Sequence, residues 1–308
     1  MNQQGKIEFE LSPVGNGGLL PFESDKVTIG GFTWSISGND ACTNKYLCIE
    51  NLQIGCTYDG PTTTLWTCEA VGNITAKDDS IDTKDDEQCM KVWTYNYHCH
   101  NPPELNKSSP KCLKWAETKF SYFFSGWKIR IVVDVNIVRS RTIDLSSREN
   151  EMISSPEDAA RVEIDNEALW LSKSKLCSVS PFFNTLFHGN FQENATDSFV
   201  LREVNVEQFL HLVAMIYGLD IPIDSNSVRY LLRLGDMYKV DNALQQCRTF
   251  LEKNVDSSNI TLEEKVLLVD KYDLFHFMEN SIQSLSEEAA KNLMENAELS
   301  EVARGLLS

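Results

Sequence analysis

The sequence predicts a multidomain α+β protein with an antiparallel β-sandwich over residues 1–140, an α/β helical cluster with a small sheet over 158–254, and further helices over 255–308. Apolar residues alternate with period two in the first half and recur at helical spacing in the second half. Between the halves, residues 141–157 have the composition of a linker. At 308 residues the chain is also too long for one typical core.

Short stretches of alternating or β-branched residues, separated by Gly, Pro and Asp clusters, predict the strands of the sandwich. The acidic run 78–87 between two of these stretches is expected to be a solvated hairpin loop. The strand candidates are residues 7–11, 26–29, 32–36, 46–50, 65–74, 91–98 and 127–138.

The second half begins with a hairpin, residues 160–164 and 169–172, around an Asp165-Asn166 turn. A strand at 198–201 and three apolar helical patterns between 206 and 251 follow. Residues placed to cap helices are Asp224 or Ser225, Asp241, and the capping box Thr261 to Glu264, with later helices near 287–296 and 298–307.

Two motifs follow the hairpin. A Lys-x-x-Leu turn is filled by Lys173 and Leu176, and a Ser-Pro-x-Phe-x-x-Leu-Phe helix is filled by Ser180, Pro181, Phe183, Leu186 and Phe187. With the hairpin before these motifs and the strand and helices after them, residues 158–254 resemble the BTB (POZ) family over about a third of the chain. Residues 255–308 look like the paired helices that extend BTB domains of ubiquitin-ligase adaptors.

In the first 140 residues, a Gly-Gly-Phe-x-Trp strand ends at Trp34, a Leu-Trp-x-Cys-Glu-Ala strand ends at Ala70, and Trp115 begins a Trp-x-x-x-x-Phe motif. Through these motifs this part resembles a MATH (TRAF-like) domain of the divergent kind that precedes BTB domains in nematode proteins. Ala116 and Glu117 depart from the Gly and the aromatic residue of the family. These departures bear on the shape of the peptide groove that the resemblance implies.

The charge of the chain is concentrated in its second half. The net charge is −17, of which residues 1–150 contribute −4 and residues 151–308 contribute −13. A field of this sign repels phosphate backbones and anionic membrane surfaces, so neither nucleic acid nor a membrane is an expected partner. No signal core and no apolar run of about 18 residues occurs.

The cysteine pattern favours a reducing compartment over a secreted disulfide framework. The nine cysteines are odd in number, and two of them, Cys177 and Cys247, fall on apolar faces of predicted helices. We therefore expect a cytoplasmic location, with the nucleus as an alternative.

The sharpest candidate for chemistry is a group of cysteines and histidines that could be imagined as a zinc site: Cys89, His98, Cys99, His100 and Cys112. If 95–100 is a strand, His98 and His100 share one face while Cys99 points away, and no Cys-x-x-Cys knuckle supports them. A Cys-His hydrolase has no characteristic spacing behind it, and no phosphate-binding glycine loop is present. We therefore expect no metal, no cofactor and no enzymatic activity.

The BTB resemblance implies a homodimer formed through the first strand and the two helices after it. The residues that match the buried interface of family dimers are Asp158, Lys173, Leu176, Phe183 and Leu186. Ser172 stands where such dimers often carry His. The same apolar positions would also fit an intramolecular core.

Phe191 and Glu193 match the hydrophobic-x-Glu motif by which BTB adaptors bind cullin-3. A phenylalanine can bury its ring in a partner groove, while a glutamate two positions on can meet a helix N-terminus or a basic side chain. The alternative is that Phe191 packs under its own loop. In the MATH-like part, Tyr97 and Trp115 match aromatics that line the substrate groove, although such residues also serve as sandwich core.

Together these features predict a non-enzymatic adaptor. The sandwich would capture a substrate protein, unknown from the sequence, and the BTB module would dimerise and recruit a cullin-3 ubiquitin ligase. The alternatives are a BTB-dimer scaffold or transcriptional co-regulator that binds no cullin, and an enzyme using the Cys/His group.

Overall fold

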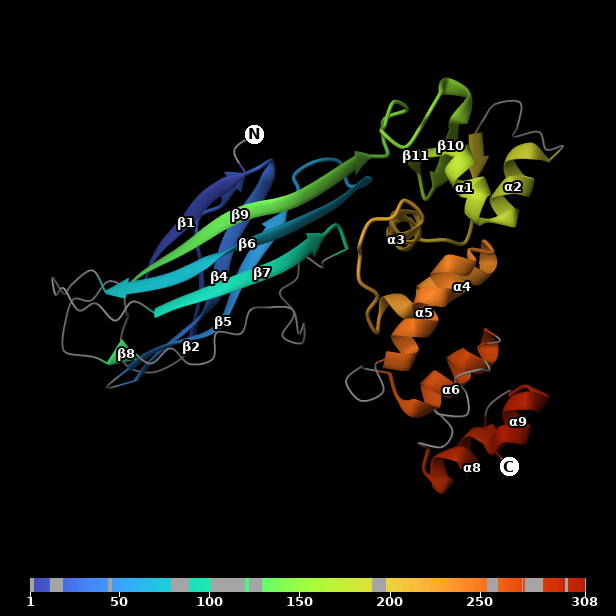
Figure 1. Ribbon diagram of the computed structural model, residues 1–308. Helices are drawn as coiled ribbons and strands as arrows, with labels where there is room; N and C mark the ends of the chain where they lie inside the picture. Colours follow the sequence, from blue (N-terminus) through green and yellow to red (C-terminus); the bar gives the residue numbers. More distant parts are fainter. Residues whose placement is uncertain are drawn as a thin grey trace. The chain divides into compact units, whose positions relative to one another are not determined.

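The computed structural model describes residues 3–11, 19–43, 46–78, 89–100, 120–121, 129–189, 198–253, 260–272, 274, 285–296 and 299–307. The chain divides into two compact units, Met1–Thr142 and Ile143–Ser308. The first is built of strands, and the second of a small sheet followed by helices (Figure 1). The predicted fold class is confirmed.

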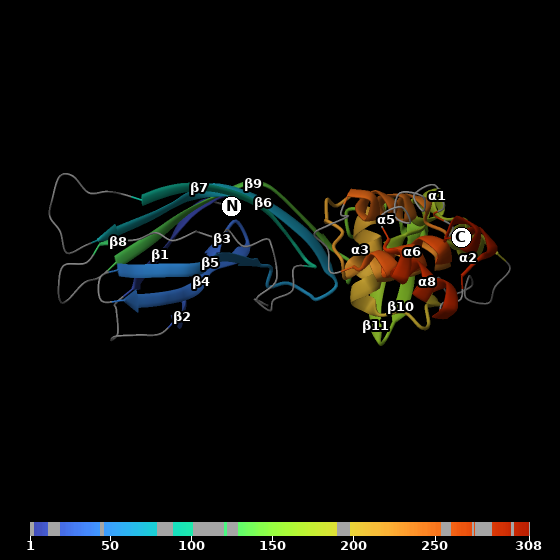
Figure 2. The same ribbon diagram turned by 90° about the horizontal axis from the view of Figure 1, so that it is seen from below.

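Two sheets make up the first unit. One has the strand order β1-β9-β6-β7, and the other has the order β2-β4-β5-β8 with β3 paired to β4. Figure 2 shows the first sheet lying over the second. The strands are β1 (Gln4–Leu11), β2 (Leu19–Glu23), β3 (Val27–Ile29), β4 (Phe32–Thr43), β5 (Tyr46–Thr57), β6 (Thr64–Asp78), β7 (Cys89–His98), β8 (Phe120–Ser121) and β9 (Ile129–Asp144).

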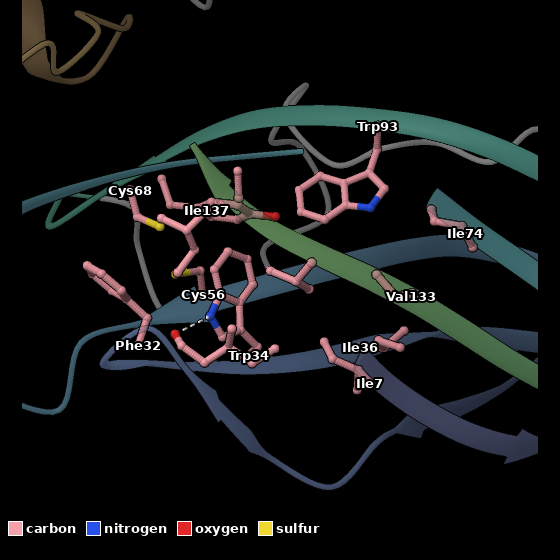
Figure 3. Packing of buried hydrophobic residues seen from close by; sticks show 14 of the residues in the cluster. Ile7, Phe32, Trp34, Ile36, Cys56, Cys68, Ile74, Trp93, Val133 and Ile137 are labelled. Atoms are coloured by element: carbon pink, nitrogen blue, oxygen red, sulfur yellow. Dashed lines mark hydrogen bonds between the residues drawn. The ribbon is translucent and has the colours of Figure 1, made fainter. Parts of the chain in front are cut away.

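The inward side chains of both sheets meet in one hydrophobic core (Figure 3). Trp34 on β4 and Trp93 on β7 are its largest buried side chains, and their ring centroids lie 6.4 Å apart across the sandwich. The absence of a side chain at Gly72 on β6 allows β9 to lie close beside it, because a Cβ at this position would overlap the carbonyl oxygen of Asp134 on β9. The apolar residues that alternate along the strands therefore point into this core, and the residues between them point outward.

Most strands run further than their sequence pattern indicated. β4 continues to Thr43 and β5 to Thr57, because each pairs with the other along nearly its whole length, including polar residues that carry no apolar alternation. Strand β2 was not predicted, since Leu19–Glu23 lacks a period-two pattern and contains a proline. It pairs antiparallel with β4.

The second unit opens with a three-stranded sheet of order β11-β10-β12, in which β12 runs parallel to β10. Its elements are η1 (Pro156–Asp158), β10 (Ala159–Ile164), β11 (Glu167–Ser172), α1 (Lys173–Val179), α2 (Pro181–His188), β12 (Ser198–Val200), α3 (Val206–Ile216), α4 (Ser227–Met237), α5 (Asp241–Lys253), α6 (Leu262–Lys271), α8 (Glu287–Asn296) and α9 (Glu301–Leu307). Figure 1 shows the sheet with α1 and α2 at one end of this unit, and α8 and α9 at the other.

The predicted hairpin is present as β10 and β11. Its two turn residues, Asp165 and Asn166, have φ angles of 48° and 74°, a conformation that Asn and Asp tolerate better than most residues. The later helices also match, since α8 covers the predicted range and α9 begins at Glu301. None of the helices that the structure describes combines the length and apolarity needed to cross a bilayer.

Candidate interaction surface

The first feature of the surface region is a buried carboxylate at the junction of β10, β11 and α1. Asp158 Oδ2 accepts hydrogen bonds from Ser172 Oγ at 2.8 Å and from Ser154 N at 3.1 Å. Its Oδ1 accepts from Ser174 N at 2.8 Å, and Ser172 N donates to Tyr217 Oη at 3.0 Å. The start of α1 is thereby tied to η1 and to α3.

These hydrogen bonds also determine the charge state of Asp158. Burial by itself would raise the pKa of the carboxyl, but the donors from Ser174, Ser154 and Ser172 outweigh it and lower the pKa below its ordinary value. The charged carboxylate sits beside the first turn of α1, where a negative charge is favourable. Ser172 completes the start of the helix, because its Oγ accepts from Lys175 N.

Helix α2 is held by a cluster of aromatic rings. The Phe183 ring stacks on Tyr238 at 5.2 Å between centroids and contacts the rings of Phe187 and Phe209. Phe187 in turn meets Phe199 of β12 at 4.9 Å. Ser180 caps the helix by accepting from Phe183 N, with Pro181 at its first position.

The five residues expected at a dimer interface lie in different environments. Leu176 and Phe183 are fully buried within the single chain, and Asp158 is nearly so. Lys173 is half-buried, and its Nζ donates to the Glu157 carbonyl at 3.2 Å. Leu186 is the one apolar member of the five that keeps part of its side chain exposed.

Leu176 and Phe183 therefore belong to the core of the single chain, and the exposed side of α1 and α2 is formed by other residues. This exposed side carries Ser174, Lys175, Ser178, Asn184 and Thr185, with half-buried Cys177, Phe182 and Leu186. Cys177 Sγ lies 3.9 Å from Nδ1 of His188, and burial raises the pKa of this thiol.

The predicted cullin-binding residues, Phe191 and Glu193, lie outside the described residues. The described chain stops at Gly189, whose N–H donates to Thr185 O at 2.8 Å, and resumes at Ser198 on β12. The motif thus lies in the segment that joins α2 to β12.

Of the two groove residues, Trp115 is outside the described residues and Tyr97 lies in the sandwich core. The Tyr97 ring makes an edge contact with Trp34 at 5.2 Å, and its hydroxyl donates to Ile54 O at 2.9 Å. With 5% of its surface exposed, Tyr97 offers little ring area to a bound peptide.

The Cys/His group is partly described. Strand β7 ends at His98, so Cys99 and His100 belong to the following turn instead of continuing the strand. Cys112 lies outside the described residues. Within the part of the chain that the structure describes, no three His, Cys, Asp or Glu side chains gather in a way that could hold a metal ion.

Residues 143–157, most of the stretch assigned to a linker by composition, pack on β11. Leu145 is fully buried, and its carbonyl accepts from Trp170 N at 2.7 Å. Asn150 Nδ2 donates to Trp170 O at 3.0 Å, and the Arg148 guanidinium lies 5.2 Å from the centre of the Trp170 ring. This segment covers the outer edge of the small sheet, which polar composition alone could not indicate.

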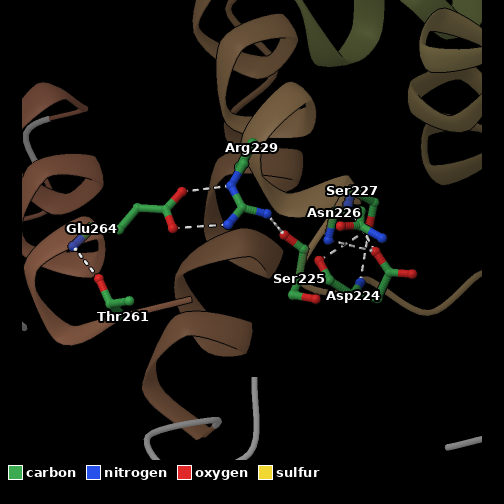
Figure 4. Close-up of polar contacts among 7 residues, drawn as sticks. All are labelled: Asp224, Ser225, Asn226, Ser227, Arg229, Thr261 and Glu264. Carbon is green, nitrogen blue, oxygen red and sulfur yellow. Dashed lines mark hydrogen bonds and ion pairs between the residues drawn. The ribbon is translucent and has the colours of Figure 1, made fainter. Parts of the chain in front are cut away.

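An ion pair between α4 and α6 is a further feature that sequence spacing did not reveal (Figure 4). Arg229 Nε and Nη2 donate to Glu264 Oε1 and Oε2 at 2.5 and 2.8 Å. In the predicted capping box Glu264 would reach back toward Thr261; here both of its oxygens accept from Arg229, while Thr261 Oγ1 still accepts from Glu264 N. The two partners are 35 positions apart, a separation that no local pattern encodes.

Residues 159–255 match the family model of the BTB/POZ domain. It is similar to BTB and MATH domain-containing protein 38 of Caenorhabditis elegans, with 24% identity over 269 residues that cover 84% of this chain and 65% of the relative. Protein 36 of the same name and organism is 26% identical over 143 residues, covering 46% of this chain and 42% of the relative. The predicted resemblance to nematode BTB and MATH proteins is confirmed.

The BTB part also aligns alone. Kelch repeat and BTB domain-containing protein 1 of vaccinia virus is 25% identical over 112 residues, which are 36% of this chain and 20% of that protein. The chain thus spans less than two thirds of the length of these relatives. The BTB/POZ match and these relatives support a role in protein interaction.

Proposed function

We propose that this protein is a non-enzymatic adaptor: its BTB unit dimerises and recruits a cullin-3 ubiquitin ligase, and its sandwich unit captures a substrate protein. The observation that carries the proposal is the pairing, in one chain, of a BTB/POZ domain with a separate β-sandwich that has its own core. Two independently packed units suit a bridging role, since each can bind one partner.

The self-association part of the proposal is supported by the way α1 and α2 are fixed. Buried contacts of Asp158 and Phe183 hold both helices rigid, so little ordering would accompany association through their exposed side. Half-buried Leu186 supplies an apolar contact there. Light scattering of the full chain at micromolar concentration tests this: we expect twice the mass of one chain, and a monomer mass would contradict it.

Recruitment of cullin-3 is supported by the match of Phe191 and Glu193 to the hydrophobic-x-Glu motif and by their place between two anchored elements. Calorimetric titration of the full chain with the N-terminal part of cullin-3 is the direct test. We expect saturable binding in the micromolar range or tighter, as a central aromatic anchor can provide. Absence of heat and of co-elution at tens of micromolar would defeat this part.

A second candidate is a BTB-dimer scaffold or transcriptional co-regulator that binds no cullin. The half-buried Leu186 face supports it equally, because it concerns self-association alone. A dimer mass combined with no cullin binding would favour this reading. Capture of a substrate protein by the sandwich would then be tested separately, by comparing partners recovered with the full chain and with a variant altered at Trp115.

A further inference from the structure

Two cysteines face each other across the core of the sandwich. Cys56 lies on β5 in one sheet and Cys68 on β6 in the other, and both are buried and present as free thiols. Figure 3 shows their sulfur atoms directed toward one another between the sheets. Six residues, 58–63, carry the chain from the end of β5 to the start of β6, so the pair sits where the chain crosses between sheets.

The strand registers explain why these two residues meet. Cys56 is the cross-strand partner of Trp34 in its sheet, and Cys68 is the cross-strand partner of Tyr97 in the other. The rings of Trp34 and Tyr97 touch across the sandwich at 5.2 Å between centroids. The contact between Trp34 and Tyr97 therefore places their cross-strand partners, Cys56 and Cys68, opposite one another.

We propose that Cys56 and Cys68 are a redox-active dithiol, which a hydroperoxide converts to a disulfide that joins the two sheets. In the first step the Cys56 sulfur, which keeps 7% exposure while Cys68 keeps none, attacks a peroxide oxygen; the O–O bond breaks and hydroxide leaves. The Cys68 sulfur then attacks the resulting sulfenic acid, the S–S bond forms, and the S–O bond breaks with loss of water. Two thiols lose two protons and two electrons, and one hydrogen peroxide becomes two waters.

The surroundings of the pair make this reaction slow. Burial, together with the adjoining thiol of Cys68, raises the pKa of the Cys56 thiol well above its ordinary value. The attacking thiolate is therefore scarce at neutral pH. The dithiol should therefore be oxidised more slowly than a solvent-exposed thiol.

The test is chemical and uses the full wild-type chain. The protein is freed of reductant, treated with hydrogen peroxide, alkylated in denaturant and cleaved after glutamate, which yields residues 51–69 with Cys56 and Cys68 but without Cys48. We expect this fragment without alkyl groups and lighter by two hydrogen atoms, and doubly alkylated after reduction. A fragment that stays doubly alkylated, or that carries added oxygen, would overturn the proposal.

Thermal unfolding supplies the second readout. Five of the six tryptophans precede Ile143, so tryptophan fluorescence follows mainly the sandwich. Closing this short loop should raise the unfolding midpoint by roughly 5 to 10 °C in the oxidised protein. Cys99→Ser, a control that packs beside the same core, should keep this rise, whereas Cys56→Ser should abolish it. An equal rise in both variants would assign the effect to other cysteines, and the mass test on wild type stands even if a variant misfolds.

Discussion

Arg229 on α4 and Glu264 on α6 form a two-point ion pair that connects the BTB helices to the C-terminal helices. Each side chain is about one third exposed, with 36% and 34% of its surface accessible. Solvent screening therefore limits the contribution of the pair, although its parallel geometry is the most favourable one for arginine and carboxylate.

We predict that Glu264→Gln lowers the free energy of unfolding by about 1 kcal/mol at neutral pH. The hydrogen bonds from Arg229 lower the pKa of Glu264 in the folded protein. The stabilisation is therefore fully present at pH values above the pKa that a glutamate has in the unfolded chain, about 4.3. It is lost as the pH falls through the lower pKa that Glu264 has in the folded protein. Urea unfolding followed by helical circular dichroism at a series of pH values measures this.

The matched control is Glu263→Gln, which makes the same charge change one residue earlier in the first turn of α6. It should reproduce any general effect of charge near the helix start without touching the pair. A difference between wild type and Glu264→Gln that is equally large in acid and at neutral pH would contradict the prediction.

Substitutions at Leu186 and Leu176 should distinguish an effect on self-association from an effect on folding stability. Leu186→Asp places a charge on the half-exposed side of α2, and we expect it to convert the proposed dimer to a monomer while the melting curve of the unit changes little. Leu176→Ala removes a fully buried side chain and should lower the free energy of unfolding by about 2 to 5 kcal/mol. Light scattering and thermal melts on both variants check this; dimers that survive Leu186→Asp would redirect the search to another face.

For the cullin motif we predict a loss of affinity without a loss of stability. Phe191→Ala should weaken cullin-3 binding by about 2 to 4 kcal/mol, and Glu193→Lys should oppose binding through its reversed charge. Calorimetry beside thermal melts measures both quantities. If Phe191 is core instead, its removal should lower the free energy of unfolding by about 3 to 5 kcal/mol, and binding would disappear together with the fold.

The boundary of the second unit gives a fourth prediction. A fragment of residues 143–308 should unfold cooperatively, whereas residues 159–308 should be less stable by at least about 3 kcal/mol. The shorter fragment lacks buried Leu145 and the Asp158 carboxylate that accepts from Ser172 and Ser174. Equal denaturation midpoints for the two fragments would show that residues 143–158 contribute nothing.

Gly72→Ala should destabilise the sandwich by about 3 kcal/mol, because the added methyl group overlaps the Asp134 carbonyl and β6 must move. Gly305→Ala is the matched control: it makes the same change on α9, where the new methyl meets nothing within 4 Å, and should stabilise slightly. Tryptophan fluorescence melts for the first and helical dichroism for the second are the measurements. An unchanged melt for Gly72→Ala would mean that the sheet adapts freely.

The sequence anticipated features that depend on local pattern and missed those that depend on distant partners. The Asp165-Asn166 turn and the helix at 287–296 follow from turn chemistry and spacing, and both were correctly predicted. The burial of Phe183 against Tyr238 joins positions far apart in the chain, so an apolar residue on α2 could equally have faced a second protomer.

Dependence on distant partners also explains why the packing of residues 143–157 and the facing of Cys56 and Cys68 were not predicted. Residues 143–157 are polar enough to resemble a tether, yet the Leu145 side chain is buried and its carbonyl accepts a hydrogen bond from Trp170 on β11. Cys56 and Cys68 fall on separate strands whose facing is set by inter-sheet packing, which no single-strand periodicity reports. Local sequence patterns do not indicate which distant strands lie opposite one another, so these contacts could not be predicted.

The contact between Phe187 and Phe199 has a consequence for the segment between them. These rings hold the end of α2 against β12, so folding has already brought together the described residues that flank positions 190–197, Gly189 and Ser198. The loss of chain entropy on loop closure is thus part of the folding free energy of the unit. A partner that engages Phe191 need not meet that loss again, whereas Phe199→Ala should free the end of α2 from β12 and weaken binding from a position outside the Phe191-x-Glu193 motif.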